Sequence, residues 1–136
     1  MQYLLLIYDR EADFENLPEK EQVAIYQEYG ALVAELKEKK IYLGGNPLKP
    51  TTTAATVRVR KGKKSVTDGP FAETKEQLAG YYILDCANLD EAIEWASRIP
   101  TECQGRQGCI EIRPMRRQPV QASSEPVVEN AAASKF

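Results

Sequence analysis

A short segment rich in charged residues is the part of this sequence best suited to chemistry. Asp68 opens an Asp-Gly-Pro-Phe stretch, and Glu73 and Glu76 follow it closely. A carboxylate in a cleft can act as a general base, while a guanidinium or ammonium group can bind a carboxylate, phosphate or enolate oxygen. We therefore take Asp68 and Glu73 as candidate catalytic residues, and Arg58 and Lys75 as candidate ligand-binding residues.

The same segment also has a purely structural interpretation. Asp68 can accept backbone hydrogen bonds in an Asx-type turn, and Gly69 can adopt a positive φ. Pro70 would stiffen the exit from the turn, and Phe71 could anchor it in the core. Because spacing does not show whether Asp68 and Glu73 converge, a catalytic pair and a solvated turn both stay open.

Two tyrosines and a basic run raise further possibilities. Tyr8 and Tyr82 are candidate ligand-binding residues, since a tyrosine can line a pocket with its ring and hydroxyl, although strand tyrosines are more often core or interface residues. Five basic residues lie within positions 58–64, but no aromatic platform is interleaved, and the chain carries 18 basic against 20 acidic residues. A solvated hairpin is favoured, so we expect no nucleic-acid partner.

The composition excludes several classes of mechanism. The 136 residues include no histidine, which rules out Ser-His-Asp catalysis, Cys-His catalysis and imidazole metal ligands. The three cysteines match no zinc-site spacing, and an odd number of thiols suits a reducing compartment. We expect no metal, no cofactor, no membrane partner and a cytoplasmic location.

Apolar spacing predicts the elements that must position the candidate residues. Residues 2–8 and 80–86 are apolar runs typical of buried strands, and residues 55–67 alternate like a hairpin. Residues 41–50, rich in Gly and Pro, predict a turn and a loop with at most a short strand. Residues 109–113 alternate as a closing strand with Ile110 and Ile112 directed inward.

Helical spacing predicts two helices. The first covers residues 18–40, with a stripe formed by Ile25, Tyr29, Leu32 and Leu36, flanked by Tyr26 and Val33. The second begins at Asn88, which resembles the start of a capping box with Glu91. Its expected buried stripe consists of Leu89, Ala92, Ile93, Ala96 and Ile99.

This element order predicts an α+β fold of the ferredoxin-like, split βαβ type, with an antiparallel sheet and both helices on one face. Residues 1–117 would form one domain, and residues 118–136 a flexible C-terminal tail. Because the sheet strands are apolar on both faces, a second surface must cover the face without helices. A second copy of the chain is the simplest candidate, so we expect a homodimer.

Residues 66–82, which contain the Asp-Gly-Pro-Phe stretch, resemble the hallmark of the DGPF-domain proteins within the YCII-related superfamily. Residues 3–8, 54–58, 90–96 and 111–114 resemble other segments of that family. The resemblance implies a dimeric α+β barrel, in which two ferredoxin-like sheets face each other. It delivers no function by itself, since members of the family are largely uncharacterised.

Three hypotheses about function follow. The first is a homodimer that binds a small polar or anionic molecule in a cleft near the DGPF loop. The second is a small enzyme of the lyase, isomerase or cofactor-free oxygenase type, with Asp68 and Glu73 as acid and base. Its mechanism cannot use the His-Asp pair proposed for some YCII proteins, because the chain lacks histidine. The third is an interaction module linked to sigma factors, which some family members accompany.

Overall fold

The computed structural model describes residues 1–102 and 106–117, in which strands alternate with helices. The elements, in chain order, are β1 (Gln2–Asp9), α1 (Glu11–Glu15), α2 (Glu19–Glu38), β2 (Tyr42–Pro47), the 3-10 turn η1 (Thr51–Thr53), β3 (Ala55–Arg60), β4 (Lys63–Asp68), β5 (Gln77–Asp85), α3 (Leu89–Ala96) and β6 (Cys109–Pro114). The predicted tail at 118–136 lies outside the described residues.

Four strands form the main sheet in the order β2-β5-β1-β6, and each neighbouring pair is antiparallel. The two central strands are therefore β5 and β1, the apolar runs of the sequence. This arrangement confirms the α+β class with an antiparallel sheet, and its strand order is compatible with a ferredoxin-like fold.

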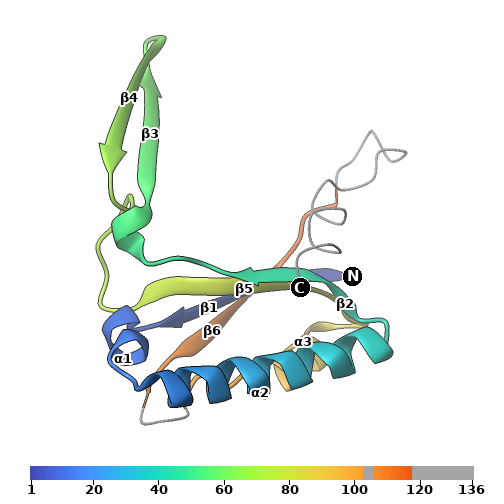
Figure 1. The fold of residues 1–136 in the computed structure, drawn as a ribbon. Helices are drawn as coiled ribbons and strands as arrows, with labels where there is room; N and C mark the ends of the chain where they lie inside the picture. Colours follow the sequence, from blue (N-terminus) through green and yellow to red (C-terminus); the bar gives the residue numbers. More distant parts are fainter. Residues whose placement is uncertain (103–105, 118–136) are drawn as a thin grey trace.

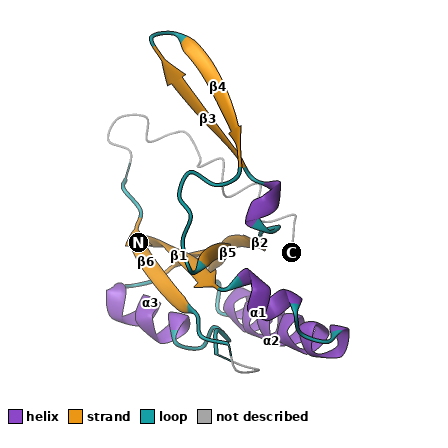
Figure 2. Cartoon of the chain, turned by 90° about the vertical axis from the view of Figure 1, so that its left-hand side faces the viewer, coloured by secondary structure: helices purple, strands orange, loops and turns teal. Residues whose placement is uncertain are grey.

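Helices α2 and α3 lie together on one face of this sheet (Figures 1 and 2). Burial alternates along β1, so that every second side chain points into the core between sheet and helices. The core includes Leu5 on β1, Leu36 on α2, Leu84 on β5 and Ala92 on α3, each at most 1% exposed. No described helix covers the other face, on which Leu4, Leu6 and Tyr8 are only half-buried.

The predicted helical stripes hold for α2 and fail in part for α3. Ile25, Leu32, Val33 and Leu36 are buried on α2. On α3, however, Leu89 and Ile93 are each 46% exposed, and Trp95 is buried instead. The predicted cap is present, because the Asn88 side chain accepts a hydrogen bond from the Glu91 backbone N–H at 3.0 Å. A helix of eight residues buries only one narrow face, and the large Trp95 side chain occupies it.

The predicted hairpin forms, but outside the main sheet. Strands β3 and β4 pair only with each other, as a two-stranded ribbon that we call the arm (residues 55–68), and it projects away from the sheet (Figure 1). Its place in the sheet is taken by β2, which lies within residues 41–50, the segment for which the sequence predicted a turn and a loop with at most a short strand. Gly45 permits this, because a Cβ there would lie 2.3 Å from the Tyr82 ring.

Two further observations concern a helix that was not predicted and the question of membrane-spanning helices. Helix α1 lies between β1 and α2, in a stretch for which the sequence predicted no element. Among the described residues, no helix combines the length and apolar character needed to cross a membrane.

Candidate functional site

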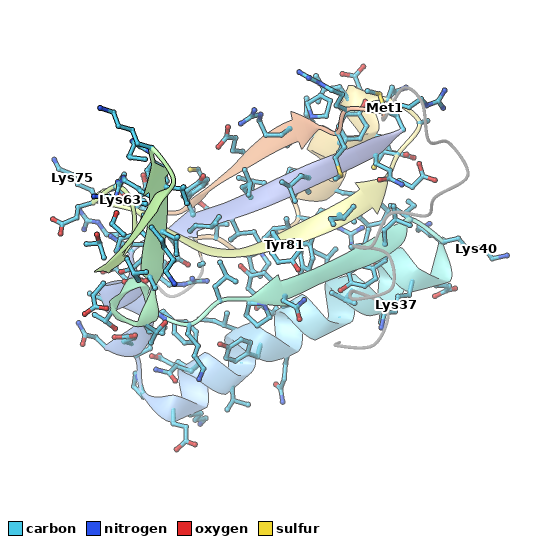
Figure 3. All side chains as sticks on the ribbon, turned by 90° about the horizontal axis from the view of Figure 1, so that it is seen from above. Met1, Lys37, Lys40, Lys63, Lys75 and Tyr81 are labelled. Atoms are coloured by element: carbon cyan, nitrogen blue, oxygen red, sulfur yellow. The ribbon has the colours of Figure 1, made fainter. Side chains whose placement is uncertain are left out.

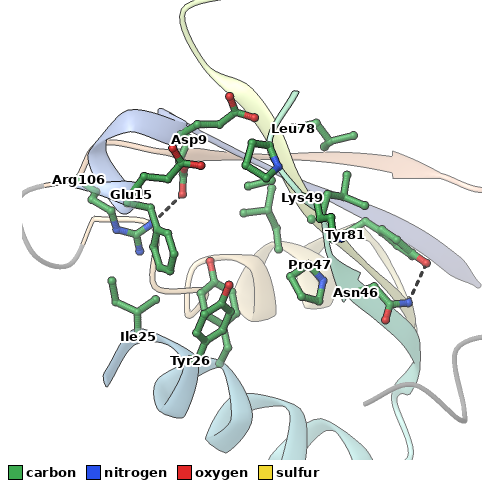
Figure 4. A pocket seen from close by; sticks show the side chains of 18 of the residues that line it. Asp9, Glu15, Ile25, Tyr26, Asn46, Pro47, Lys49, Leu78, Tyr81 and Arg106 are labelled. Atoms are coloured by element: carbon green, nitrogen blue, oxygen red, sulfur yellow. Dashed lines mark hydrogen bonds and ion pairs between the residues drawn. The ribbon is translucent and has the colours of Figure 1, made fainter. Parts of the chain in front are cut away.

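A pocket of about 390 Å³ lies on the helix side of the sheet, where the end of β1 meets α1 and the first half of α2. That size is in the range of small-molecule sites. Most of its wall is apolar or aromatic, and its polar groups are few (Figure 4). The principal lining residues are Ile7, Asp9, Glu11, Phe14, Ile25, Tyr26, Tyr29, Asn46, Pro47, Leu78, Tyr81, Tyr82 and Arg106.

A buried ion pair forms one end of this pocket. Arg106 donates from Nη1 to Asp9 Oδ2 at 2.6 Å and from Nη2 to the Pro100 carbonyl oxygen at 2.7 Å. The two side chains of the pair are only 3% and 8% exposed. Asp9 and Arg106 are the buried charged residues of the described chain. Since an unpaired buried charge is very unfavourable, each residue requires the other.

The fold brings these two residues together, although they lie 97 positions apart in the sequence. Asp9 continues the buried face of β1, two positions after Ile7. The segment carrying Arg106 can reach β1 because Gly108 has no side chain, since a Cβ there would lie 2.6 Å from the Tyr8 carbonyl oxygen. The Gly108 N–H also donates to the Thr101 carbonyl oxygen at 3.1 Å, which holds the residue before β6 next to the segment that follows α3.

A β-bulge shapes the wall opposite α2. The register between β1 and β5 shifts after Ile7, which leaves Ala79 as an extra residue on β5. The Ala79 carbonyl oxygen accepts a hydrogen bond from the Leu48 N–H at 2.8 Å. This contact holds the segment that follows β2 beside the pocket.

Glu11 fixes α1 above the pocket. Its carboxylate accepts hydrogen bonds from the Thr51 backbone N–H at 2.6 Å and from the Thr51 hydroxyl at 2.9 Å. Its own backbone N–H donates to the Gln77 side chain at 3.0 Å. Both oxygens of Glu11 are thus engaged in holding α1 against η1 and β5, which makes Glu11 a positioning residue.

A second polar contact lies on the face of the sheet without helices, because Tyr81 is opposite Leu6 and Asn46 is opposite Tyr81 in the strand register. The Asn46 side chain donates to the Tyr81 hydroxyl at 3.2 Å (Figure 4). Beside the ion pair, the wall of the pocket is aromatic. Phe14 and Tyr26 pack edge to face with ring centroids 5.5 Å apart, and Tyr29 contacts the buried Tyr82. The arrangement suits a molecule with an apolar body and a polar group.

Burial raises the pKa of Asp9 above its ordinary value, and the Arg106 guanidinium opposes that rise. The neighbouring carboxylates of Asp13, Glu11 and Glu76 raise the pKa of Asp9 further. Burial and the guanidinium thus act on Asp9 in opposite directions, as expected for a buried ion pair.

The four charged candidates named from the sequence lie in two places. Asp68 and Arg58 lie on the arm, and Glu73 and Lys75 on the loop between β4 and β5. All four are exposed, and none lines the pocket. Figure 3 looks onto the sheet from the side opposite α2 and shows Lys63 of the arm and Lys75 at one end of the molecule. The sequence prediction of a catalytic pair at Asp68 and Glu73 stays a prediction.

The two tyrosine candidates separate. Tyr82 is 3% exposed and lines the pocket, and burial raises the pKa of its hydroxyl. Tyr8 lies on the face of the sheet without helices, where its hydroxyl donates to Glu111 at 3.4 Å. Burial, followed by the nearby Glu111, raises the pKa of Tyr8 as well.

Sequence reasoning missed Asp9 and Arg106. A signal for Asp9 existed, because the period of two that buries Tyr3, Leu5 and Ile7 also directs Asp9 inward. Arg106 carries no comparable signal, since it belongs to no helix or strand. In residues 1–102 and 106–117, no three acidic or cysteine side chains gather as a metal site would need.

Fold and pocket together define a small α+β protein with one antiparallel four-stranded sheet and a ligand-sized cavity beneath it. The family model of the YCII-related domain matches residues 1–118. An uncharacterized protein of Rhizobium meliloti (strain 1021) is 37% identical over 115 residues, covering 85% of this chain and 92% of that protein. The chain belongs to the YCII-related family.

Proposed function

We propose that this protein binds a small molecule in the pocket between β1, α1 and α2. The observation that supports this proposal best is the ion pair of Asp9 and Arg106, buried at one end of an otherwise largely apolar cavity of about 390 Å³. Few convergent polar groups in an apolar cavity are typical of ligand sites. The predicted compartment is still the cytoplasm, and the narrower assignment to DGPF-domain proteins still rests on the resemblance.

A thermal-shift screen with a metabolite library tests the proposal and its location. We expect a binding compound to raise the unfolding midpoint of the wild type, and to raise it much less in Asp9→Asn. Asp68→Ala is the matched control, because Asp68 is an exposed carboxylate outside the pocket. A compound that loses its effect in Asp68→Ala but keeps it in Asp9→Asn would move the site to the DGPF loop.

We further propose that the protein is a homodimer in which the arm contacts a second copy. A two-stranded ribbon is marginally stable by itself. One face of the arm is nevertheless apolar and uncovered, with Val57 at 57%, Val59 at 61% and Val66 at 57% exposure. The arm carries five basic residues and one acidic residue, whereas the chain as a whole is slightly acidic. The remainder of a second copy therefore offers the complementary charge.

Sedimentation at several protein concentrations tests the dimer. Val57→Lys places a charge on the apolar face of the arm, and we expect it to shift the population toward monomer. Ser65→Lys adds the same charge on the opposite face, where Ser65 pairs with Arg58, and should leave the dimer intact. A wild-type protein that sediments as a monomer at every concentration refutes the proposal.

A further inference from the structure

The charges around the pocket point to the class of ligand. Three carboxylates line it, those of Asp9, Glu11 and Glu15, against two basic groups, Arg106 and Lys49. Arg106 already donates to Asp9 and to a backbone carbonyl oxygen, so its positive charge is balanced inside the protein. Lys49 and Glu15 are both exposed, so solvent screens these two opposite charges alike. The Asp9–Arg106 pair is neutral as a unit, so the lining carries an excess of one negative charge, that of Glu11.

Asp9 offers the decisive contact. Its Oδ2 accepts from Arg106, whereas its Oδ1 has no hydrogen-bond partner among the described residues. The Asp9 side chain is only 8% exposed, and the residue lines the pocket. No fully buried side-chain oxygen or nitrogen of the described residues lacks a hydrogen-bond partner, so Oδ1 is open to the pocket. A carboxylate oxygen that faces a pocket and has no protein partner can accept a hydrogen bond from a ligand, and this bond is strongest when the donor is charged.

The aromatic wall adds a second, independent preference. Phe14, Tyr26, Tyr29 and Tyr82 line the cavity. The faces of aromatic rings carry negative potential, so a cation within about 6 Å of a ring centroid is attracted. Tyr26 is 53% exposed and pairs with Phe14, which places both rings where an entering ligand can contact them.

We propose that the ligand is an organic cation, with an apolar or aromatic body and a protonated amine that donates to Asp9 Oδ1. This inference rests on the proposed pocket and names its ligand class. It differs from the sequence expectation of a small polar or anionic ligand, which depended on Arg58 and Lys75, because neither of these residues lines the pocket.

Three probes of nearly equal size separate charge from shape: 2-phenylethylamine, 2-phenylethanol and phenylacetate. Binding of each to the full chain is followed by amide chemical shifts of isotope-labelled protein, up to about 10 mM probe. We expect the amine to bind at least about tenfold more tightly than the alcohol or the anion, with shifts at the lining residues of β1 and β5.

Variants then assign the preference to its source. Asp9→Asn should lower amine affinity at least about tenfold and leave alcohol affinity unchanged. Tyr26→Leu, at the exposed edge of the pocket, should weaken the amine about threefold or more and keeps the proposal testable if Asp9→Asn does not fold. Glu28→Gln removes an exposed carboxylate of α2 that lies outside the pocket and is the matched control.

The outcomes separate this inference from the proposed function. Equal binding of the three probes, or tighter binding of phenylacetate, overturns the cation inference but keeps the pocket. Failure of all three probes, with a neutral or anionic library compound still acting through Asp9, also overturns the cation inference alone, whereas a cationic library compound acting through Asp9 supports it. Failure of the probes and of the library together overturns the pocket itself.

Discussion

Removal of the Arg106 guanidinium is the strongest single perturbation of the candidate site. In Arg106→Met, the Asp9 carboxylate remains at 8% side-chain exposure and loses its charged partner. Breaking a buried ion pair in this way costs about 3–5 kcal/mol of folding free energy. For a chain of this length, that corresponds to a midpoint about 10–15 °C lower. Urea unfolding at fixed protein concentration, together with thermal unfolding, measures both quantities.

The pH dependence of this loss has a definite sign. Burial raises the pKa of Asp9 in the folded protein above its value of about 4 in the unfolded chain. Protonation of Asp9 therefore contributes fully to the free energy of unfolding below about pH 4, and this contribution is lost as the pH rises through the folded pKa. Arg106 opposes that rise, and its removal raises the folded pKa further. The loss of unfolding free energy in Arg106→Met relative to wild type should therefore be largest near about pH 7 and become smaller toward about pH 4.

Two comparisons make the reasoning refutable. Asp9→Leu/Arg106→Met replaces the whole pair by apolar side chains and should be more stable than Arg106→Met alone. Arg98→Met breaks a pair of equal length, 2.6 Å to Glu35, whose side chains are 48% and 38% exposed. It should cost much less stability than Arg106→Met, because solvent screens an exposed ion pair. Equal losses in Arg98→Met and Arg106→Met, or a double variant less stable than the single one, would refute the argument from burial.

Two further predictions concern the fold around the site. Gly45→Ala forces a Cβ to within 2.3 Å of the Tyr82 ring and should destabilise the protein by about 1–3 kcal/mol, whereas Gly30→Ala, with nothing within 4 Å, should stabilise α2 by about 0.5–1 kcal/mol. Denaturant unfolding that ranks these variants in the opposite order contradicts the close packing of β2 on β5. Asn88→Ala removes the side chain that accepts from Glu91 and should cost about 1 kcal/mol, and a change below about 0.3 kcal/mol shows that the cap is unimportant.

The local elements were largely predictable because hydrophobic period is a local property. The spacing of Ile25, Leu32 and Leu36 predicts α2, and the alternation through Ile110 and Ile112 predicts β6. The cap at Asn88 also depends on neighbours in sequence only. Where the prediction failed, as at Leu89 and Ile93, the reason was tertiary, because Trp95 occupies the narrow buried face of α3.

What the sequence determined by itself was therefore the fold class, the core strands, the main helices and the exclusion of histidine chemistry. The tertiary structure decided the rest. It placed β2 in the sheet and the arm outside it, and it joined Asp9 to Arg106 across 97 positions. The physical reason is that a buried charge is stable only beside a partner, and chain topology, which local spacing does not encode, selects that partner.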